Sequence, residues 1–355
     1  SILAIVTIGT IGWIVVAYIT DRHQTRHTVR RNFPVIGRFR YLFEHLGEFF
    51  RQYFFAMDRE EMPFNRAERG WVYRAAKNES TTVAFGSTRR LDIPGTIMFV
   101  NSPFPSLKHD GCLSRAVTIG ELCRTPFTTS ALVNISGMSY GALSKPAILA
   151  LSKGAKKAGC WMNTGEGGLS SFHLEGGCDI VFQIGTAKYG VRDEMGELDE
   201  KKLADLAHIE RVRMFEIKLS QGAKPGKGGI LPGAKVSAEI AAIRGIPEGQ
   251  DSISPNGHPE IRSVDDILDM VARVRAITGK PTGFKTVLGD VDWIRDLCRE
   301  IERRGAESAP DFITLDGAEG GTGAAPQSLI DYMGLPIGQA LPMLVDVLDE
   351  FGLRP

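Results

Sequence analysis

The sequence has no paired cysteines. Its five cysteines are odd in number, and none forms a C-x-x-C pair with another, which argues against a disulfide framework and against a zinc site. We therefore expect a reducing compartment and no bound metal ion. The five residues are Cys112, Cys123, Cys160, Cys178 and Cys298.

An excess of one charge and a dinucleotide fingerprint are missing too. The 42 Lys and Arg side chains balance 42 Asp and Glu side chains, so no overall field attracts a polyanion, and we expect no nucleic-acid partner. No G-x-G-x-x-G follows the first predicted strand, so the sequence carries no dinucleotide-binding fingerprint at that position.

A long apolar run is present at residues 1–20, "SILAIVTIGTIGWIVVAYIT", without one charged side chain. At about 1.5 Å per helical residue, this run matches the ~30 Å core of a bilayer and predicts a transmembrane helix. The alternative is a cleaved signal peptide, whose apolar region is shorter, about 7–15 residues, and ends at a small-residue cleavage site. The positive-inside rule predicts a single-pass membrane protein whose body is cytoplasmic, because one acidic residue, Asp21, is followed by Arg22, Arg26, Arg30, Arg31, Arg38 and Arg40.

Residues 21–60 form the predicted basic juxtamembrane segment. Within it, residues 39–57 place aromatic side chains at helical spacing, which fits an interfacial helix at the membrane or a helix packed on the body, and both alternatives stay open. Residues 61–130 carry turn signals and short strands, and we expect them to be an N-terminal extension packing on a larger domain at 131–355.

Beyond residue 130, apolar runs of strand length alternate with helical patterns, which is typical of βαβ units. Two helices are well marked: residues 263–279, which begin with Ser263 and Asp266 in a capping-box-like pair and end at Gly279, and residues 291–305, with Cys298 in the buried stripe. The predicted strands are 132–136, 160–164, 180–184, 214–219, 282–287 and 312–315.

Polar, glycine-rich segments follow four of these strands: "ISGMSYGALS", "NTGEGG", "SQGAKPGKGG" and "DGAEGGTGAAP". A (β/α)₈ TIM barrel has its functional residues at the carboxyl ends of several strands, whereas a doubly wound sheet has its phosphate loop after the first strand. The sequence therefore predicts an α/β fold of TIM-barrel type, incomplete at its C-terminal end because the chain stops where a seventh strand is due.

The strand at 214–219 contains a lysine. Alternation directs Phe215, Ile217 and Leu219 to one face and Lys218 to the other, which points into the barrel. A buried ammonium group needs an anionic or accepting partner. An internal ion pair with Glu216 is one alternative, and a bound cofactor is the other.

The motifs "MSYGALS" (138–144), "NTGEGG" (163–168), "EIKLSQGAKPGKGGILPGAKV" (216–236), "ISPNGHPEIRSVDDI" (253–267) and "GGTGAAP" (320–326) occur in one order over about residues 130–355. In that order and spacing they resemble the FMN-binding synthase domain of glutamate synthases. More closely, the chain is similar to the membrane-anchored, stand-alone branch known as FMN-binding glutamate synthase family proteins. The resemblance implies an FMN-dependent oxidoreductase that converts 2-oxoglutarate, or a related 2-oxo acid, and ammonia to an amino acid.

The resemblance also implies roles for individual residues. Glu166, Lys218 and Lys224 match the catalytic positions, with Lys218 beside the flavin and Lys224 beside the imine, while Lys224 and Arg244 match the substrate-binding positions. Alternatives without function are a loop cap for Glu166, a solvated charge for Lys224 and a surface charge for Arg244. Lys227 is expected to be a solvated loop charge. The cofactor-binding positions are Ser139, Tyr140, Gly141, Asn163, Thr164, Gly165, Lys218, Lys285, Gly320 and Gly321.

Two departures from the family pattern limit the transfer. Ile230 stands where the large glutamate synthases carry a substrate-binding glutamine. Because an isoleucine side chain cannot donate a hydrogen bond, the identity of the 2-oxo acid substrate stays open. The chain also stops before the loops that would hold the FMN phosphate and an iron–sulfur cluster. A fragment of a longer protein, a chain that needs a partner, or one that has lost FMN would each explain this.

A glutaminase domain with an N-terminal cysteine nucleophile is not found, so ammonia would come from solution or another subunit. A ferredoxin-like protein or a membrane dehydrogenase is the expected electron donor. The alternative to an enzyme is a non-catalytic, membrane-anchored subunit that retains part of a barrel.

Overall fold

A computed structural model describes residues 2–111, 115–323 and 325–354, so that Cys112 and Ala324 of "GGTGAAP" lie outside the described residues. Within the described part, the chain forms two compact units, residues 1–100 and 101–355. The domain boundaries expected after residues 20, 60 and 130 stay predictions.

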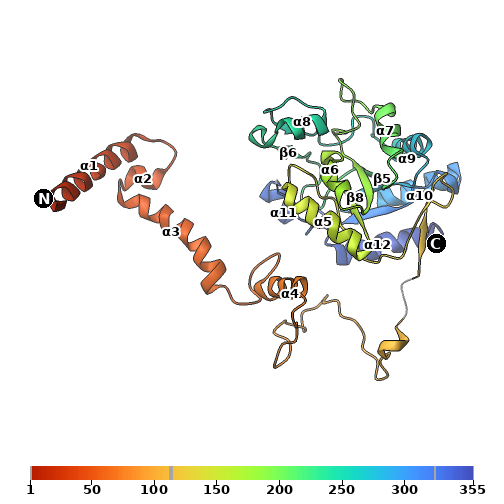
Figure 1. Ribbon diagram of the computed structural model, residues 1–355, viewed down its shortest axis with the longest axis horizontal. Helices are drawn as coiled ribbons and strands as arrows, with labels where there is room; N and C mark the ends of the chain where they lie inside the picture. Colours follow the sequence, from red (N-terminus) through yellow and green to blue (C-terminus); the bar gives the residue numbers. More distant parts are fainter. Residues whose placement is uncertain (1, 112–114, 324, 355) are drawn as a thin grey trace. The chain divides into compact units, whose positions relative to one another are not determined.

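The first unit is helical (Figure 1). Its α1 has 22 residues and is long and apolar enough to cross a bilayer. A signal sequence near an N-terminus has the same properties, so the helix alone does not distinguish the two. The helices are α1 (Ile2–His23), α2 (Thr28–Asn32), α3 (Ile36–Phe50), the π-helix η1 (Arg51–Phe55) and α4 (Arg66–Ala76), which begins with a capping box of Asn65 and Glu68.

The second unit is built on a parallel sheet. Within residues 115–323 the sheet has five strands in the order β3-β4-β5-β8-β9, and it curls into a half-barrel (Figure 1). The strands are β3 (Trp161–Asn163), β4 (Asp179–Ile184), β5 (Val212–Lys218), β8 (Thr282–Val287) and β9 (Ile313–Asp316). Two antiparallel ribbons accompany them: β1 (Val117–Ile119) with β2 (Phe127–Thr129), and β6 (Ile230–Leu231) with β7 (Ser252–Ile253).

Helices follow the strands and cover the outer face of the sheet. Two of them, α9 (Val264–Thr278) and α10 (Asp292–Arg304), begin and end as the sequence predicts. The Ser263 side chain accepts a hydrogen bond from Asp266 N at the start of α9, and Gly279 takes the left-handed conformation after its end. The helices are α5 (Lys145–Ala158), α6 (Ser171–Glu175), α7 (Glu200–Ala207), α8 (Ala238–Arg244), α9 (Val264–Thr278), α10 (Asp292–Arg304), α11 (Gln327–Tyr332) and α12 (Ile337–Glu350).

The order of the strands supports a barrel-like winding. Parallel neighbours follow each other in chain order, without the reversal of a doubly wound sheet. Five of the six predicted strands are present. The prediction of a strand at 132–136 is wrong, because only Ile135 pairs, with Met162, while Leu132 and Val133 are more than 80% exposed. Closure into eight strands stays a prediction.

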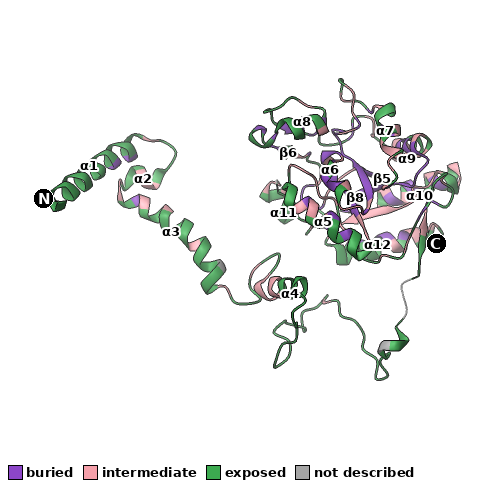
Figure 2. Cartoon of the chain, viewed as in Figure 1, coloured by how far each residue is buried: buried purple, intermediate pink, exposed green. Residues whose placement is uncertain are grey.

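The core lies between the sheet and its helices (Figure 2). Phe182, Phe215, Ile217 and Phe284 are fully buried there with the inner faces of α9 and α10. Side chains on the other face of the same strands, among them Glu216 and Lys218, point into the half-barrel, so the predicted alternation in β5 is confirmed. Cys298 is buried in the core as predicted, and it is free, like Cys123, Cys160 and Cys178.

Candidate active site

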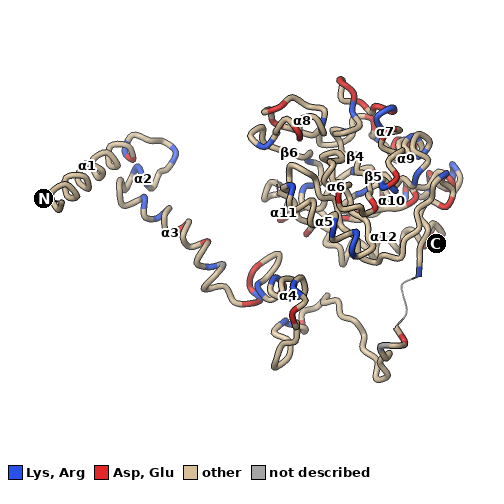
Figure 3. Tube along the Cα trace, in the orientation of Figure 1, with Lys and Arg blue, Asp and Glu red and all other residues tan. Residues whose placement is uncertain are grey.

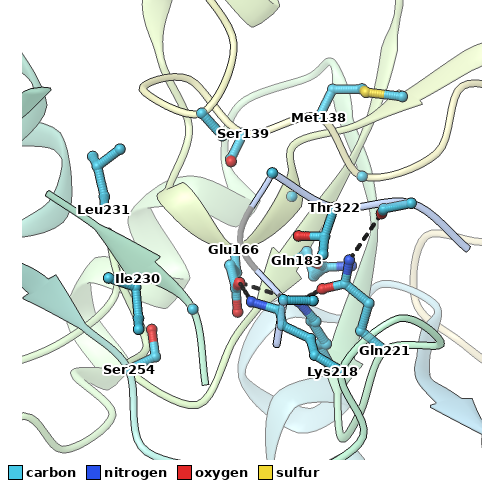
Figure 4. A pocket seen from close by; sticks show the side chains of 18 of the residues that line it. Met138, Ser139, Glu166, Gln183, Lys218, Gln221, Ile230, Leu231, Ser254 and Thr322 are labelled. Carbon is cyan, nitrogen blue, oxygen red and sulfur yellow. Dashed lines mark hydrogen bonds and ion pairs between the residues drawn. The ribbon is translucent and has the colours of Figure 1, made fainter. Parts of the chain in front are cut away.

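A cavity of about 920 Å³ lies at the carboxyl ends of the parallel strands. Its walls come from the loops that follow the strands and from the β6–β7 ribbon, the position where a barrel carries its functional residues (Figure 4). The volume is in the range of small-molecule and cofactor sites, about 300–1,000 Å³. Segments that are far apart in the sequence therefore meet at a single candidate site.

Glu166 lies in the cavity wall, in the 3₁₀ turn η3 (Gly165–Gly167) after β3. Its Oε1 is 3.1 Å from Lys218 Nζ and 3.8 Å from Lys224 Nζ. Burial by itself raises the pKa of the Glu166 carboxyl, but the two ammonium groups outweigh it and leave the pKa below its usual value. The carboxylate is ionised and paired, which contradicts the alternative of a simple loop cap.

Lys218 is the last residue of β5 and is 9% exposed. Its Nζ donates to Gln221 Oε1 at 2.8 Å in addition to its ion pair with Glu166 (Figure 4). The suggested ion pair with Glu216 is wrong. Glu216 lies two residues earlier and accepts hydrogen bonds from neutral side chains instead. The ammonium group of Lys218 therefore points to the cavity side, toward Glu166.

Lys224 is buried in the loop after β5, with 4% of its surface exposed. Its Nζ donates to Gly228 O at 3.4 Å and lies near Glu166. Burial lowers the pKa of the Lys224 ammonium, and the charges of Lys218 and Lys227 lower it further, whereas Glu166 opposes the change. The alternative of a solvated loop charge is wrong for Lys224; Lys227, by contrast, is exposed at the cavity rim.

Arg244 is the last residue of α8, yet it is 5% exposed and lines the cavity, so the alternative of a surface charge is wrong. Its Nη1 donates to Ser252 Oγ at 2.9 Å, and its guanidinium stacks over the Tyr189 ring at 5.1 Å. Nε is buried without a hydrogen-bond partner in the described chain. Burial lowers its pKa, but an arginine stays protonated, so the guanidinium places a buried positive charge in the wall of the cavity.

The far wall comes from β8 and from the loop after β9. Lys285 Nζ pairs with Asp316 Oδ2 at 3.1 Å, and the same Asp316 oxygen accepts from Gly222 N. Gly320 and Gly321 line the cavity with bare backbone, and Gln221 Nε2 donates to Gly321 O at 3.2 Å. The loops after β5 and β9 are therefore joined beside Lys218.

A hydrogen-bonded layer of side chains lies under the cavity. Glu216 of β5 accepts at one oxygen from Asn163 Nδ2 and Gln183 Nε2, at 2.9 and 2.6 Å, and at the other from Thr314 Oγ1 at 2.5 Å. Asn163 in turn accepts from Gly165 N at 2.9 Å. The carboxylate thus joins four strands and fixes the amide that holds the turn carrying Glu166.

The remaining predicted cofactor residues are divided between the cavity and its surroundings. Ser139 and Gly165 line it, and a Cβ at Gly165 would lie 2.8 Å from Ser139 N, so the close approach requires glycine. Tyr140 donates its hydroxyl to Glu239 instead of facing the cavity. Gly141, Asn163 and Thr164 are not lining residues either, and their roles stay predictions.

Several lining residues were not expected from the sequence, among them the polar side chains of Gln183, Gln221 and Asp316. Their positions gave a signal, because Gln183 is an inward residue of a predicted strand and the other two follow strand ends. Ile230 lies in β6 with 41% of its surface exposed and also lines the cavity. Among the described residues, no cluster of His, Cys, Asp and Glu side chains is arranged to hold a metal ion.

Comparison with known protein families shows to which family the chain belongs. A model of the conserved region in glutamate synthase matches residues 106–355. The chain belongs to the glutamate synthase family. It is 39% identical to the glutamate synthase large subunit-like protein YerD of Bacillus subtilis, over 97% of this chain and 71% of YerD.

Other members of the glutamate synthase family match a shorter part. The archaeal glutamate synthase (NADPH) of Methanocaldococcus jannaschii is 39% identical over 62% of this chain, but only 40% of that protein is covered, so its whole activity does not follow from the match. A solved structure of a mandelate oxidase variant with a C4a-hydroxy-FMN adduct has a TM-score of 0.35 at 16% identity, covering 67% of this chain and 60% of the oxidase. A similarity of that size carries no conclusion.

Proposed function

We propose that the protein is an FMN-dependent oxidoreductase of glutamate-synthase type, which reductively aminates 2-oxoglutarate or a related 2-oxo acid. The observation that carries the proposal is the placement of Glu166 between two lysines, in a cavity that Arg244 also lines. Membership of the glutamate synthase family supports it.

The cavity has the donor set that a flavin ring requires. Lys218 supplies a fixed positive charge at the floor, and Ser139, Gln183 and the backbone of Gly320 and Gly321 supply polar groups around it. A Cβ at Gly321 would meet no atom within 4 Å, so the backbone there is open to a ligand. When bound, FMN would supply the hydride for the reduction.

The chain's own residues have distinct tasks in this scheme. Arg244 binds the substrate carboxylate, since a guanidinium in the cavity wall suits a carboxylate in both charge and shape. As ammonia attacks the 2-oxo carbon, Glu166 accepts a proton from the nitrogen and Lys224 donates one to the oxygen; Glu166 then returns its proton to Lys224, and a second transfer of the same kind releases the oxygen as water and leaves the imine. Lys218 stabilises negative charge on the cofactor side of the cavity.

The proposal extends to location and partners. We propose that α1 is a single-pass membrane anchor with the body on the cytoplasmic side, because arginines follow its end. The electron donor would be a ferredoxin-like protein or a membrane dehydrogenase.

Purification of the longest natural form in mild detergent tests the enzyme proposal. We expect flavin absorption bands and formation of an amino acid from a 2-oxo acid, ammonium and reduced donor. Absence of flavin after FMN has been added in excess would instead favour the non-catalytic subunit.

A further inference from the structure

Helix α3 and the π-helix η1 expose a continuous apolar face. Their large apolar side chains recur at helical spacing on one side, from Ile36 to Phe54, and all are at least 36% exposed. The opposite side carries polar residues, among them Glu44, His45 and Glu48. The members of the apolar face are Ile36, Phe39, Leu42, Phe43, Leu46, Phe49, Phe50, Tyr53 and Phe54.

The start of this helix is fixed to the end of α1 by a buried carboxylate. Asp21 in the last turn of α1 has no exposed surface, and its Oδ1 accepts from Arg30 Nε and Nη2 at 3.0 and 2.7 Å. Its Oδ2 accepts from Val35 N at 3.0 Å and Arg38 Nε at 2.7 Å, and Arg38 Nη2 donates to Oδ1 at 3.0 Å. Five donors from α2, the α2–α3 turn and α3 therefore meet on one side chain.

This arrangement makes a fixed corner of α1, α2 and α3. Gly37 fits the same corner closely, since a Cβ there would lie 3.0 Å from Arg30 Cα. The Arg38 guanidinium also lies over the Trp13 ring at 5.8 Å, which adds a contact to α1 itself. The direction in which α3 leaves α1 is thus set by side-chain contacts and not by a flexible linker.

The basic charge around α3 indicates which kind of partner its apolar face would contact. Residues 21–51 contain seven arginines against three acidic residues, and basic side chains recur from the end of α1 into α3 (Figure 3). Arg26, Arg31 and Arg40 are exposed. An apolar helix face with basic flanks, fixed to the end of a helix that is long enough to cross a bilayer, matches an anionic lipid surface in both chemistry and position.

We propose that α3 and η1 lie in the headgroup region of an anionic bilayer, with the apolar face toward the acyl chains and the Asp21 corner joining them to α1. The anchor then has two parts, one that crosses the bilayer and one that lies in its surface. The proposal is independent of the reaction in the cavity, because it uses no residue beyond position 55.

Photo-crosslinking of the full chain in proteoliposomes tests the proposal. The photoreactive residue p-benzoylphenylalanine is placed either at Phe43, on the apolar face, or at His45, on the opposite side two residues away. The vesicles contain phosphatidylcholine and phosphatidylglycerol, and one or the other lipid carries the label in separate preparations. We expect at least a fivefold higher yield of lipid adduct from position 43 than from position 45.

Equal lipid labelling at the two positions would overturn the proposal. So would a position 43 adduct with residues 101–355 of the same chain, or with a second copy, since either result would place protein and not lipid on the apolar face. The double variant Arg26→Gln, Arg31→Gln tests the charge argument: we expect less labelling by phosphatidylglycerol relative to labelled phosphatidylcholine, with the ratio between positions 43 and 45 unchanged. An unchanged lipid preference would overturn the anionic assignment.

Discussion

Three lysines of one loop differ in burial, and the difference predicts distinct effects of their removal. Lys218 is fixed by Glu166 and Gln221 at the cavity floor, Lys224 is buried beside Glu166, and Lys227 is exposed. In the flavin-containing natural form, Lys218→Met should make flavin reduction harder, because loss of the nearby charge removes about 1–3 kcal/mol of stabilisation. At neutral pH, Lys224→Met should lower turnover with little change in flavin potential, and Lys227→Met should change neither. Redox titration and steady-state rates measure the two effects; a potential that responds only to Lys227 would contradict the assignment of Lys218.

The lowered pKa of Lys224 predicts the alkaline limb of the activity profile. If its ammonium donates a proton, activity falls as pH rises through the folded pKa, which burial keeps below that of a free lysine. Because the charge of Lys227 also lowers this pKa, Lys227→Met should move the limb to higher pH. The pH dependence of kcat tests this, with Lys235→Met as a control at another exposed lysine of the cavity. A limb that moves to lower pH in Lys227→Met would reverse the predicted sign.

Glu216 holds the layer under the cavity, and its removal should affect both stability and the site. Gln in its place offers one acceptor oxygen to three donors and leaves buried groups unpaired, at a cost of about 1–3 kcal/mol. Glu216→Gln should therefore lower the free energy of unfolding, and it should also weaken flavin binding because Asn163 no longer fixes Gly165 N. Denaturant unfolding and flavin titration measure the two effects. The exposed Glu210→Gln is the control, and equal stability of the two variants would show that the layer contributes nothing.

At the scale of elements, local signals predicted the helices better than the sheet edge. The caps of α9 and the apolar stripes of α9 and α10 are encoded in or next to the helices themselves, so the bounds of both helices agree with the prediction to within a residue at each end. The run at 132–136 has the composition of a strand, but strand formation depends on partners distant in sequence, and only Ile135 finds one. The two-residue strands β6 and β7 were missed because segments of that length show no periodicity.

In the site, too, features set by local sequence were predicted and features that depend on distant partners were not. Alternation along β5 placed Lys218 correctly, because the period of a strand is a local property. Which carboxylate pairs with it was not predictable from spacing alone: the partner is Glu166, some fifty residues earlier, and not the neighbouring Glu216. The burial of Lys224 and Arg244 likewise depends on the fold of the β6–β7 ribbon and α8 around them.

The N-terminal cap of α9 gives a stability prediction for a single element. Ser263 Oγ accepts from Asp266 N and donates to Asp266 Oδ2, so its loss leaves a helix end unsatisfied. Ser263→Ala should destabilise the second unit by about 1 kcal/mol. Ser263→Thr retains the hydroxyl and is the control. If thermal or denaturant unfolding shows the same loss for both variants, the effect does not come from the cap.

At the scale of the whole molecule, the two units differ in what buries their apolar surface. The unit of residues 101–355 has its own core between sheet and helices, whereas α1 and α3 leave most of their large apolar side chains exposed. Globular domains rarely expose so much contiguous apolar surface in water. A bilayer around residues 1–55 would remove this surface from water, and the same bilayer would give the protein a fixed orientation.

That orientation is the last prediction. Residues 21–40 contain six arginines and one acidic residue, Asp21. Positively charged segments next to a membrane span stay on the cytoplasmic side during insertion. Protease added to sealed vesicles should therefore digest residues 101–355 only in vesicles whose cytoplasmic face is outward, and detergent should expose the protein in both preparations. A periplasmic or luminal marker protein controls for sealing. Digestion from the opposite face would reverse the topology, and it would place the cavity away from any cytoplasmic electron donor.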